Sequence, residues 1–131
     1  MPFDFQNDPS LTGDVGRTNY HAGVSAELAV ARYYQRQGAV LRESRWRGRC
    51  GEIDLIFAEG DAIVFVEVKK SRTHERALQH VTRGQLARIV RSGEDYLGSC
   101  PNGTLTDARI DVALVDAGGA IEIIPNASMS L

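Results

Sequence analysis

Residues 51–70 read GEIDLIFAEGDAIVFVEVKK, and this stretch decides the fold. Two runs rich in β-branched and aromatic residues, at about 51–58 and 62–69, flank a turn signal at residues 59–61. A two-residue turn at Gly60-Asp61, with glycine first as a type II′ turn prefers, would pair Glu59 with Ala62. The stretch therefore predicts a β-hairpin whose charged residues gather at the end away from the turn.

The register of this hairpin places two carboxylates face to face. Counting back from the turn sets Asp54 opposite Glu67, and opposed residues have Cβ atoms roughly 5 Å apart on one face. Lys69 shares the face of Glu67 because side chains alternate along a strand. A turn at Glu59-Gly60 would instead oppose Glu52 to Glu67 and keep Asp54 on the same side. A three-residue loop would move Asp54 to the other face.

The second face of the hairpin carries side chains without a polar atom, and we expect it to be the core-facing side. The alternative is an edge hairpin with a solvated charged end, in which Glu67 and Lys69 form only a surface ion pair. The expected core residues are Ile53, Leu55, Phe57, Val64, Val66 and Val68.

The opposed carboxylates indicate a metal site. Like charges placed directly opposite each other are destabilising, and a cation between them removes that penalty. No His or Cys belongs to the cluster, so all ligands would be oxygens, which favour Mg²⁺, Mn²⁺ or Ca²⁺ over zinc or copper. A divalent cation with a lysine beside it suits chemistry on phosphate.

Composition allows a single domain, and we place it at residues 20–131 of the 131. The net charge of −2 does not by itself indicate a nucleic-acid-binding protein. Charge is unevenly distributed, however: residues 42–91 hold 11 of the 15 Lys and Arg but 7 of the 17 acidic residues, a local balance of +4. This distribution predicts a basic surface around the hairpin.

The remaining features point to the cytoplasm. Cys50 and Cys100 are too few for a disulfide framework or a zinc site, which fits a reducing compartment. Residues 1–19 are polar, with no basic start and no apolar run, so we expect a flexible leader and not a signal peptide. No apolar stretch is long enough to span a membrane, so we expect no membrane partner.

Periodicity and turn signals predict an α/β chain with the order α-β-β-β-α-β-β. A helix at 20–37 ends at Gly38, and a polar loop at 70–77 separates the hairpin from the second helix. The other expected elements are a strand at 39–46, a helix at about 78–97, and strands at 109–115 and 120–124 that are joined across Gly118-Gly119.

This order, with Asp on the second strand and Glu-x-Lys on the third, resembles the restriction-endonuclease-like fold of the PD-(D/E)xK nuclease superfamily. More closely, the chain is similar to the YraN-type family of uncharacterised bacterial proteins, described as predicted endonucleases distantly similar to archaeal Holliday junction resolvases. The resemblance covers about residues 20–125. The segments that carry it are Glu27-Leu28-Ala29, Gly51-Glu52-Ile53-Asp54-Leu55-Ile56, Val64-Phe65-Val66-Glu67-Val68-Lys69, Val81-Thr82-Arg83 and Arg109-Ile110-Asp111-Val112.

The resemblance implies a restriction-endonuclease-like core with a mixed sheet and a set of roles for the site. Asp54 and Glu67 would be ligands of Mg²⁺ or Mn²⁺ together with the Val68 carbonyl. Lys69 would be the catalytic lysine, and Glu27 an acidic helper from the first helix. Three positions depart from the family pattern: Ala26 replaces a usual Gly, Arg45 a common Asn, and Gln85 a usual Lys.

Three functions are compatible with the sequence, and the first two follow from the resemblance. The first is a metal-dependent nuclease that hydrolyses phosphodiester bonds in nucleic acid, DNA foremost. Branched or other structured DNA, single strands and RNA all stay open as its substrate. The second is a catalytically inactive nucleic-acid-binding or scaffold module on the same fold, and either allows for a homodimer. A third, an interaction domain unrelated to nucleic acid, needs the charge cluster to be accidental. The expected nucleic-acid contacts are Arg45, Arg47, Lys70, Arg72, Arg83, Gln85 and Arg88.

Overall fold

The protein contains an open five-stranded sheet. The computed structural model describes the backbone of residues 15–130 and the side chains of residues 25–128. The strands follow one another in the order β1-β2-β3-β4-β5, and only β3 and β4 are parallel neighbours. This mixed sheet confirms the predicted α/β class. The strands are β1 Val40–Gly48, β2 Gly51–Glu59, β3 Ala62–Lys70, β4 Ala108–Val115 and β5 Ile121–Ile124.

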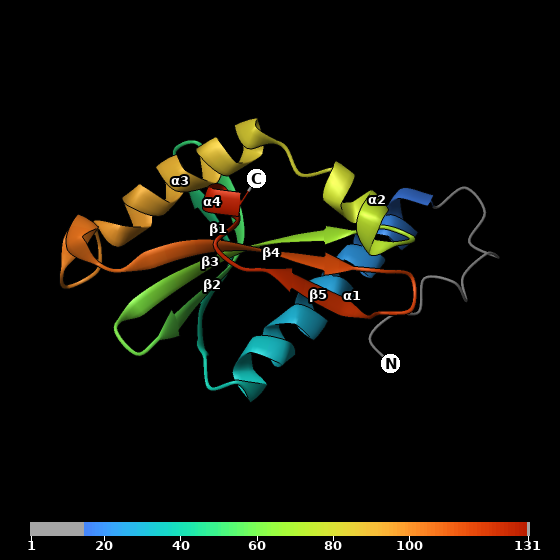
Figure 1. Cartoon of the computed structure of the whole chain (residues 1–131), viewed down its shortest axis with the longest axis horizontal. Coiled ribbons are helices and arrows are strands. Elements are labelled where there is room, and N and C mark those ends of the chain that lie inside the picture. The colour runs from blue at the N-terminus through green and yellow to red at the C-terminus, as the bar shows by residue number, and fades with distance from the viewer. Residues whose placement is uncertain (1–14, 131) are drawn as a thin grey trace.

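Two helices cover the sheet from opposite sides, α1 on one face and α3 on the other (Figure 1). The order α-β-β-β-α-β-β is confirmed, with short helices added to it. Within residues 15–130, no helix is both long and apolar enough to span a bilayer. The helical elements are α1 Val15–Arg36, α2 His74–Gln79, α3 Arg83–Leu97, the 3-10 turn η2 Gly103–Leu105 and α4 Ala127–Ser130.

Helix α1 starts earlier than the sequence predicted. It begins at Val15, so residues 15–19, expected to belong to the polar leader, are helical. Residues 1–14 of the expected leader lie outside the described residues. The end of the helix was predicted well, because Gly38 has φ +95 and a glycine in this left-handed region ends helices at little steric cost.

The second helical region is two helices, which corrects the predicted loop at 70–77 and single helix at 78–97. Helix α2 occupies His74–Gln79, and α3 starts anew at Arg83. Each helix has its own N-cap: the Thr73 side chain accepts from the Arg76 N–H, and the Thr82 side chain from the Gln85 N–H. These threonines satisfy backbone donors that a continuous helix would have paired internally.

The predicted hairpin register is confirmed from Glu59–Ala62 to Leu55–Val66. Gly60 has φ +61 while Asp61 does not adopt positive φ, as a type II′ turn requires. The regular ladder ends at Leu55–Val66, immediately before Asp54 and Glu67. The two strands therefore diverge where their carboxylates lie.

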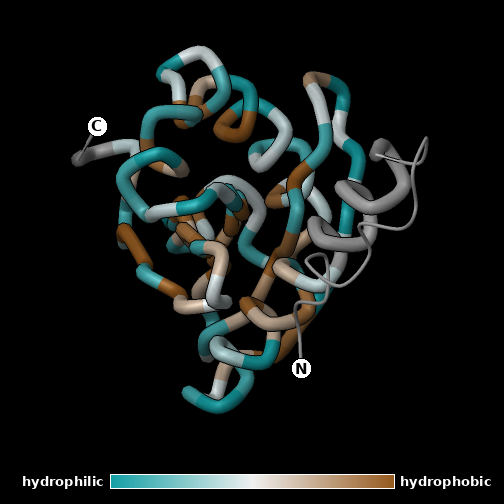
Figure 2. Tube along the Cα trace, turned by 90° about the vertical axis from the view of Figure 1, so that its right-hand side faces the viewer, coloured by the Kyte–Doolittle hydropathy of each residue, from teal (hydrophilic) through white to brown (hydrophobic). Residues whose placement is uncertain are grey.

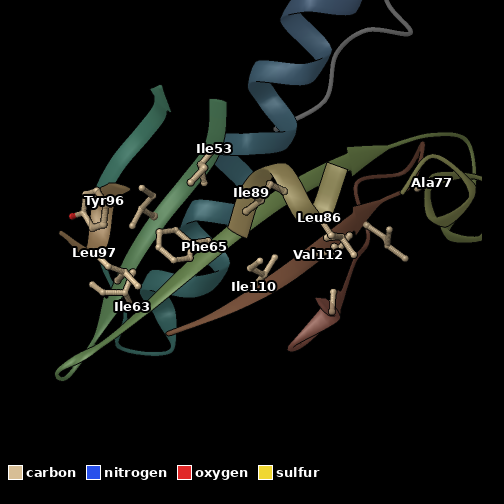
Figure 3. Packing of buried hydrophobic residues seen from close by; sticks show 13 residues of the cluster. Ile53, Ile63, Phe65, Ala77, Leu86, Ile89, Tyr96, Leu97, Ile110 and Val112 are labelled. Carbon is tan, nitrogen blue, oxygen red and sulfur yellow. The ribbon is translucent and has the colours of Figure 1, made fainter. Parts of the chain in front are cut away.

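Both faces of the sheet are buried, which corrects the expectation of one core face and one charged face. Leu55, Phe57, Val64 and Val66 lie in the cluster beneath α1, as predicted. A second cluster fills the space beneath α3 (Figure 3), and Figure 2 shows hydrophobic residues gathered mainly at the centre of the molecule. Strand residues in this second cluster include Ile53, Ile56, Ile63 and Phe65.

Strand β2 changes face at Asp54, which explains why Ile53 lies in the unexpected cluster. Ser44 pairs with Leu55 and Trp46 with Ile53, so Arg45 and Asp54 are both left out of the ladder. Arg45 has φ +52, a left-handed conformation that is uncommon for a residue with a side chain. This local twist releases Asp54 from the sheet and turns it toward β3.

Two glycines of α3 give a matched pair of predictions. A Cβ on Gly93 would lie 2.9 Å from the ring of Phe65, whereas at Gly84 the nearest atom is 3.9 Å away. We expect Gly93→Ala to reduce the free energy of unfolding by about 1–3 kcal/mol because the buried ring must move. Gly84→Ala should increase it by up to ~1 kcal/mol through helix propensity. Urea unfolding measures both, and equal effects of the two substitutions would contradict the close packing of Gly93.

Candidate active site

Asp54 bridges the gap where β2 and β3 separate. Its Oδ2 accepts a 2.8 Å hydrogen bond from the Val68 backbone N–H, and its carboxyl is hydrogen-bonded to that of Glu67. The N–H of Val68 is available because the ladder has already ended. In a strand the carbonyl of a residue leaves on the same side as its N–H, so the Val68 carbonyl also points toward Asp54.

Strand β3 presents Glu67 and Lys69 together on the α3 side. Lys69 Nζ lies 3.2 Å from Glu67 Oε2, and the two side chains are 16% and 14% exposed. Pairing of β3 with β4 is unbroken from Ile63 to Lys70, so side chains alternate regularly. Lys70 therefore lies on the opposite face, where burial lowers the pKa of its ammonium group.

The two carboxyl groups hold a proton more tightly than ordinary carboxyls do. Burial, and then the nearby charge of Asp54, raise the pKa of Glu67 to about 7. Burial also raises the pKa of Asp54, and the hydrogen bonds from Val68 and Glu67 oppose this effect only in part. The raised pKa of Glu67 lies near neutral pH in the metal-free protein, which is the expected response of two crowded carboxylates.

Glu27 reaches the same place from α1. Burial, and then the charge of Asp54, raise the pKa of Glu27, so this carboxyl lies close to the pair. Arg45 Nε donates to Glu27 Oε1 over 3.1 Å. Arg45, whose backbone is left-handed, thus makes an ion pair that joins β1 to α1 beside Asp54.

Two turns further along α1, Tyr34 fixes the helix to the sheet. Its hydroxyl donates over 2.6 Å to the carboxylate of Asp111, which is 1% exposed. Asp111 also accepts from Arg109 Nε and from the Asn126 N–H, both over 3.0 Å. This buried network of hydrogen bonds holds the helix that carries Glu27.

A small cavity opens beside the pair and contains a residue that the sequence prediction left out. Its volume is about 120 Å³, and its lining includes Glu52 and Glu67 from the strands and Gln85 and Arg88 from α3. The charge of Glu52 contributes to the raised pKa values of Glu27 and Asp54. The two-residue spacing of Glu52 and Asp54 was the signal that could have added Glu52 to the predicted site.

Helix α3 also holds the turn that precedes Glu52. Ser92 Oγ donates to the Gly51 carbonyl over 3.0 Å, and a Cβ on Gly48 would lie 2.8 Å from Ser92. Asp95 accepts from both the backbone N–H and the guanidinium of Arg49. No sequence motif marked these contacts, which position the start of β2.

Only some of the predicted nucleic-acid contacts lie beside the carboxylate pair. Gln85 and Arg88 line the cavity, and Arg45 lies against Glu27. Arg47 is exposed and lies opposite Glu52 in the backbone register of β1 and β2. Arg83 is exposed in the first turn of α3. Lys70 points away from the cavity, and Arg72 is exposed between β3 and α2. The structure thus brings Asp54, Glu67, Lys69 and Glu27 together, with only part of the predicted basic set around them.

The oxygen donors fit a hard divalent cation. Among residues 25–128, no three or more His, Cys, Asp or Glu side chains are arranged to hold a metal. Mg²⁺, however, is commonly held by one or two carboxylates, with waters and substrate phosphate completing its shell. Asp54 and Glu67 supply two crowded carboxylates, and the Val68 carbonyl lies on the same side.

The raised pKa of Glu67 predicts how stability depends on pH. The folded state binds this proton more tightly than the unfolded chain, so stability is full below about pH 4.5 and is lost as the pH rises through about 7. For metal-free protein, we expect the free energy of unfolding to fall by roughly 2–3 kcal/mol across that range. Urea unfolding at pH 5 and pH 8 measures the change.

Glu67→Gln is the control for this prediction because it cannot ionise. It should be as stable as the wild type at pH 5 and more stable at pH 8. Its free energy of unfolding should change less between the two pH values. A wild type that gains stability between pH 5 and pH 8, relative to Glu67→Gln, would contradict the repulsion between Asp54 and Glu67.

Fold and site together define a mixed-sheet α/β protein with a carboxylate pair and a lysine where two strands diverge. The sequence matches the uncharacterised protein family UPF0102 over residues 26–115, and the chain belongs to this family. This confirms the resemblance to the YraN-type family.

Relatives in the family match most of the chain. A UPF0102 protein of Roseobacter denitrificans is 51% identical over 112 residues, which cover 86% of this chain and 87% of the relative. A UPF0102 protein of Cereibacter sphaeroides strain KD131 is also 51% identical, with 86% and 96% covered. One from Ruegeria pomeroyi is 49% identical, with 86% and 91% covered.

Proposed function

We propose that the protein is a metal-dependent endonuclease of the restriction-endonuclease-like type, acting on phosphodiester bonds in branched or other structured DNA. The observation that carries this proposal is the arrangement of Asp54, Glu67 and Lys69 at the point where β2 and β3 diverge. The carboxyls are crowded enough to share a proton, and the ammonium group lies beside them. An open cavity adjoins them.

Each residue of the site has a role in this proposal. Asp54, Glu67 and the Val68 carbonyl would hold Mg²⁺ or Mn²⁺, and such an ion supplies an activated water and neutralises developing charge on phosphate. Lys69 is close enough to the pair to donate to that water or to a phosphate oxygen, which stabilises the transition state. Glu27, whose pKa is raised, would accept a proton from that water.

Basic residues flank this cluster on two elements. Arg83 and Arg88 belong to the first two turns of α3, and Arg45 and Arg47 to β1. Among the residues whose side chains are described, Arg88 and Arg47 make no ion pair that would occupy them. Contacts of this kind with phosphates position a nucleic acid without reading its sequence, so we expect cleavage with little base specificity.

The direct test is cleavage of matched branched, single-stranded and duplex DNA in the presence of Mg²⁺ or Mn²⁺. Glu67→Ala, purified in parallel, is the control. We expect wild-type protein to cut at least one branched substrate and the variant to cut none. Cleavage of the same bonds by both preparations would contradict the proposed site.

Nucleic-acid affinity should depend steeply on salt. Each phosphate neutralised by Arg or Lys releases counterions, so the logarithm of the association constant falls with a slope of about −0.9 per contact in duplex DNA. With Arg47, Arg83 and Arg88 as contacts, Arg83→Ala/Arg88→Ala should reduce that slope by about two. Fluorescence anisotropy at several salt concentrations measures it, and a flat dependence would point to another class of partner.

The second candidate is a nucleic-acid-binding or scaffold module that cuts nothing. The net charge of −2 and a glutamine in place of a basic residue at position 85 favour this candidate. Binding of branched DNA with no cleavage under either metal would select it.

A further inference from the structure

We propose that Gln85 is a positioning residue, which fixes the ammonium group of Lys69 from the first turn of α3. The catalytic consequence of this inference rests on the proposed function, whereas the contact between Gln85 and Lys69 does not depend on it. It also revises the prediction that Gln85 binds nucleic acid directly. Gln85 is half-buried and lines the cavity next to Glu67.

The amide of Gln85 has a donor on one side and an acceptor on the other. The amide atom nearest Lys69 lies 3.0 Å from Nζ, and the other amide atom lies 2.9 Å from the His80 carbonyl oxygen. An ammonium group can only donate and a carbonyl can only accept. The amide oxygen must therefore face Lys69 and the amide nitrogen His80, since the reverse orientation sets donor against donor and acceptor against acceptor.

The reverse orientation of the Gln85 amide makes weaker hydrogen bonds. In the reverse orientation the amide oxygen accepts from the Thr82 N–H over 3.3 Å, as part of a capping box. The orientation toward Lys69 exchanges this one long contact for two shorter ones, of which one involves a charged donor. Hydrogen bonds to charged groups contribute more than neutral ones. Thr82 still caps the helix by accepting from the Gln85 N–H.

Lys69 is thus held between two acceptors on different elements. Glu67 Oε2 lies 3.2 Å away on the same strand, and the Gln85 oxygen lies 3.0 Å away on α3. Because Gln85 is itself tied to His80, the junction between α2 and α3 sets the position of the lysine. Without Gln85, the long flexible side chain would have one remaining acceptor and more accessible conformations.

Chemical acetylation can test this contact without relying on catalysis. Lys69 and Lys70 are the chain's only lysines, so tandem mass spectrometry after limited acetylation reports the two amines side by side. In Gln85→Leu we expect the ratio of Lys69 to Lys70 modification to rise about tenfold, the factor expected from losing one hydrogen bond to a charged group. Gln85→Glu keeps an acceptor for Lys69 but cannot donate to the His80 carbonyl, and its charge favours the protonated amine, so its ratio should stay at or below that of wild type.

Thr73→Ala is the matched structural control. It removes the side-chain cap of α2, as Gln85→Leu disturbs the start of α3, but it leaves the surroundings of Lys69 unchanged. Its acetylation ratio should equal that of the wild type. In cleavage assays Gln85→Leu should lower kcat about tenfold with KM nearly unchanged, and Gln85→Glu should restore most of kcat.

The outcomes separate this inference from the proposed function. An unchanged acetylation ratio in Gln85→Leu, or an equal rise in Thr73→Ala, overturns the positioning role whatever the enzyme cuts. A raised ratio with a lower kcat supports it. A raised ratio in a protein that cuts no substrate confirms the contact, but overturns the proposed function and with it the catalytic consequence.

Discussion

Lys69→Ala is expected to reduce the rate of DNA cleavage by roughly 10²–10³-fold or more, because it removes the only ammonium group beside the carboxylate pair among residues 25–128. Nucleic-acid affinity should change little, since the exposed arginines of β1 and α3 remain. Single-turnover kinetics with the best substrate of the panel, together with anisotropy measurements, separate the two effects.

Lys70→Ala is the internal control for this result. The two lysines are adjacent and equal in charge, but strand alternation places Lys70 on the face away from Glu67. Its replacement should leave cleavage nearly unchanged. If Lys69→Ala cuts as fast as the wild type, the catalytic assignment is wrong and a contaminating nuclease becomes the explanation.

Mn²⁺ or Mg²⁺ should raise the melting temperature of the wild type and leave that of Asp54→Ala/Glu67→Ala unchanged. A ligand present at ten times its Kd adds about 1.4 kcal/mol to the free energy of unfolding, which corresponds to about 5 °C for a domain of this size. The single variant Glu67→Ala, which keeps the hydrogen bond from the Val68 N–H to Asp54, should melt at a higher temperature than the metal-free wild type because repulsion within the pair is gone.

Glu75→Ala/Glu94→Ala is the matched control for charge. Both residues are exposed, and their removal changes the net charge by the same amount away from the site. This variant should show the wild-type shift with metal. Equal shifts in all three proteins would show that the ion binds elsewhere, which removes the metal site from the proposal.

The hairpin could be predicted from the sequence because its signals are local. Gly60-Asp61 defined the turn, and two-residue alternation then carried the register as far as Leu55–Val66. The lysine-bearing face was also predictable, since β3 is regular over its full length.

Alternation failed at Asp54, where no local pattern of residues indicates a change of face. The cause lies on the neighbouring strand, at the left-handed Arg45, and such a long-range effect leaves no periodic signal. The second core under α3 was missed for a different reason. Ile56, Ile63 and Phe65 were counted with the charged face, although apolar residues on both faces are typical of a sheet covered twice.

The contacts of the site that cross between elements were also beyond prediction. The resemblance implied an acidic helper at Glu27, and Gln85 was an expected nucleic-acid contact. Only the packing of α1 and α3 brings these two side chains toward Asp54 and Lys69. The start of α3 was predictable in principle, because Thr82-x-x-Gln85 has the spacing of a capping box.

The change of face at Asp54 makes the site a meeting point of the two layers that cover the sheet. Glu27 arrives from the layer of α1, and Gln85 and Arg88 arrive from the layer of α3. A folding intermediate with one helix docked would therefore contain an incomplete site. The proposed chemistry would therefore require the fully assembled protein, and a ligand bound there would link the local opening of one layer to that of the other.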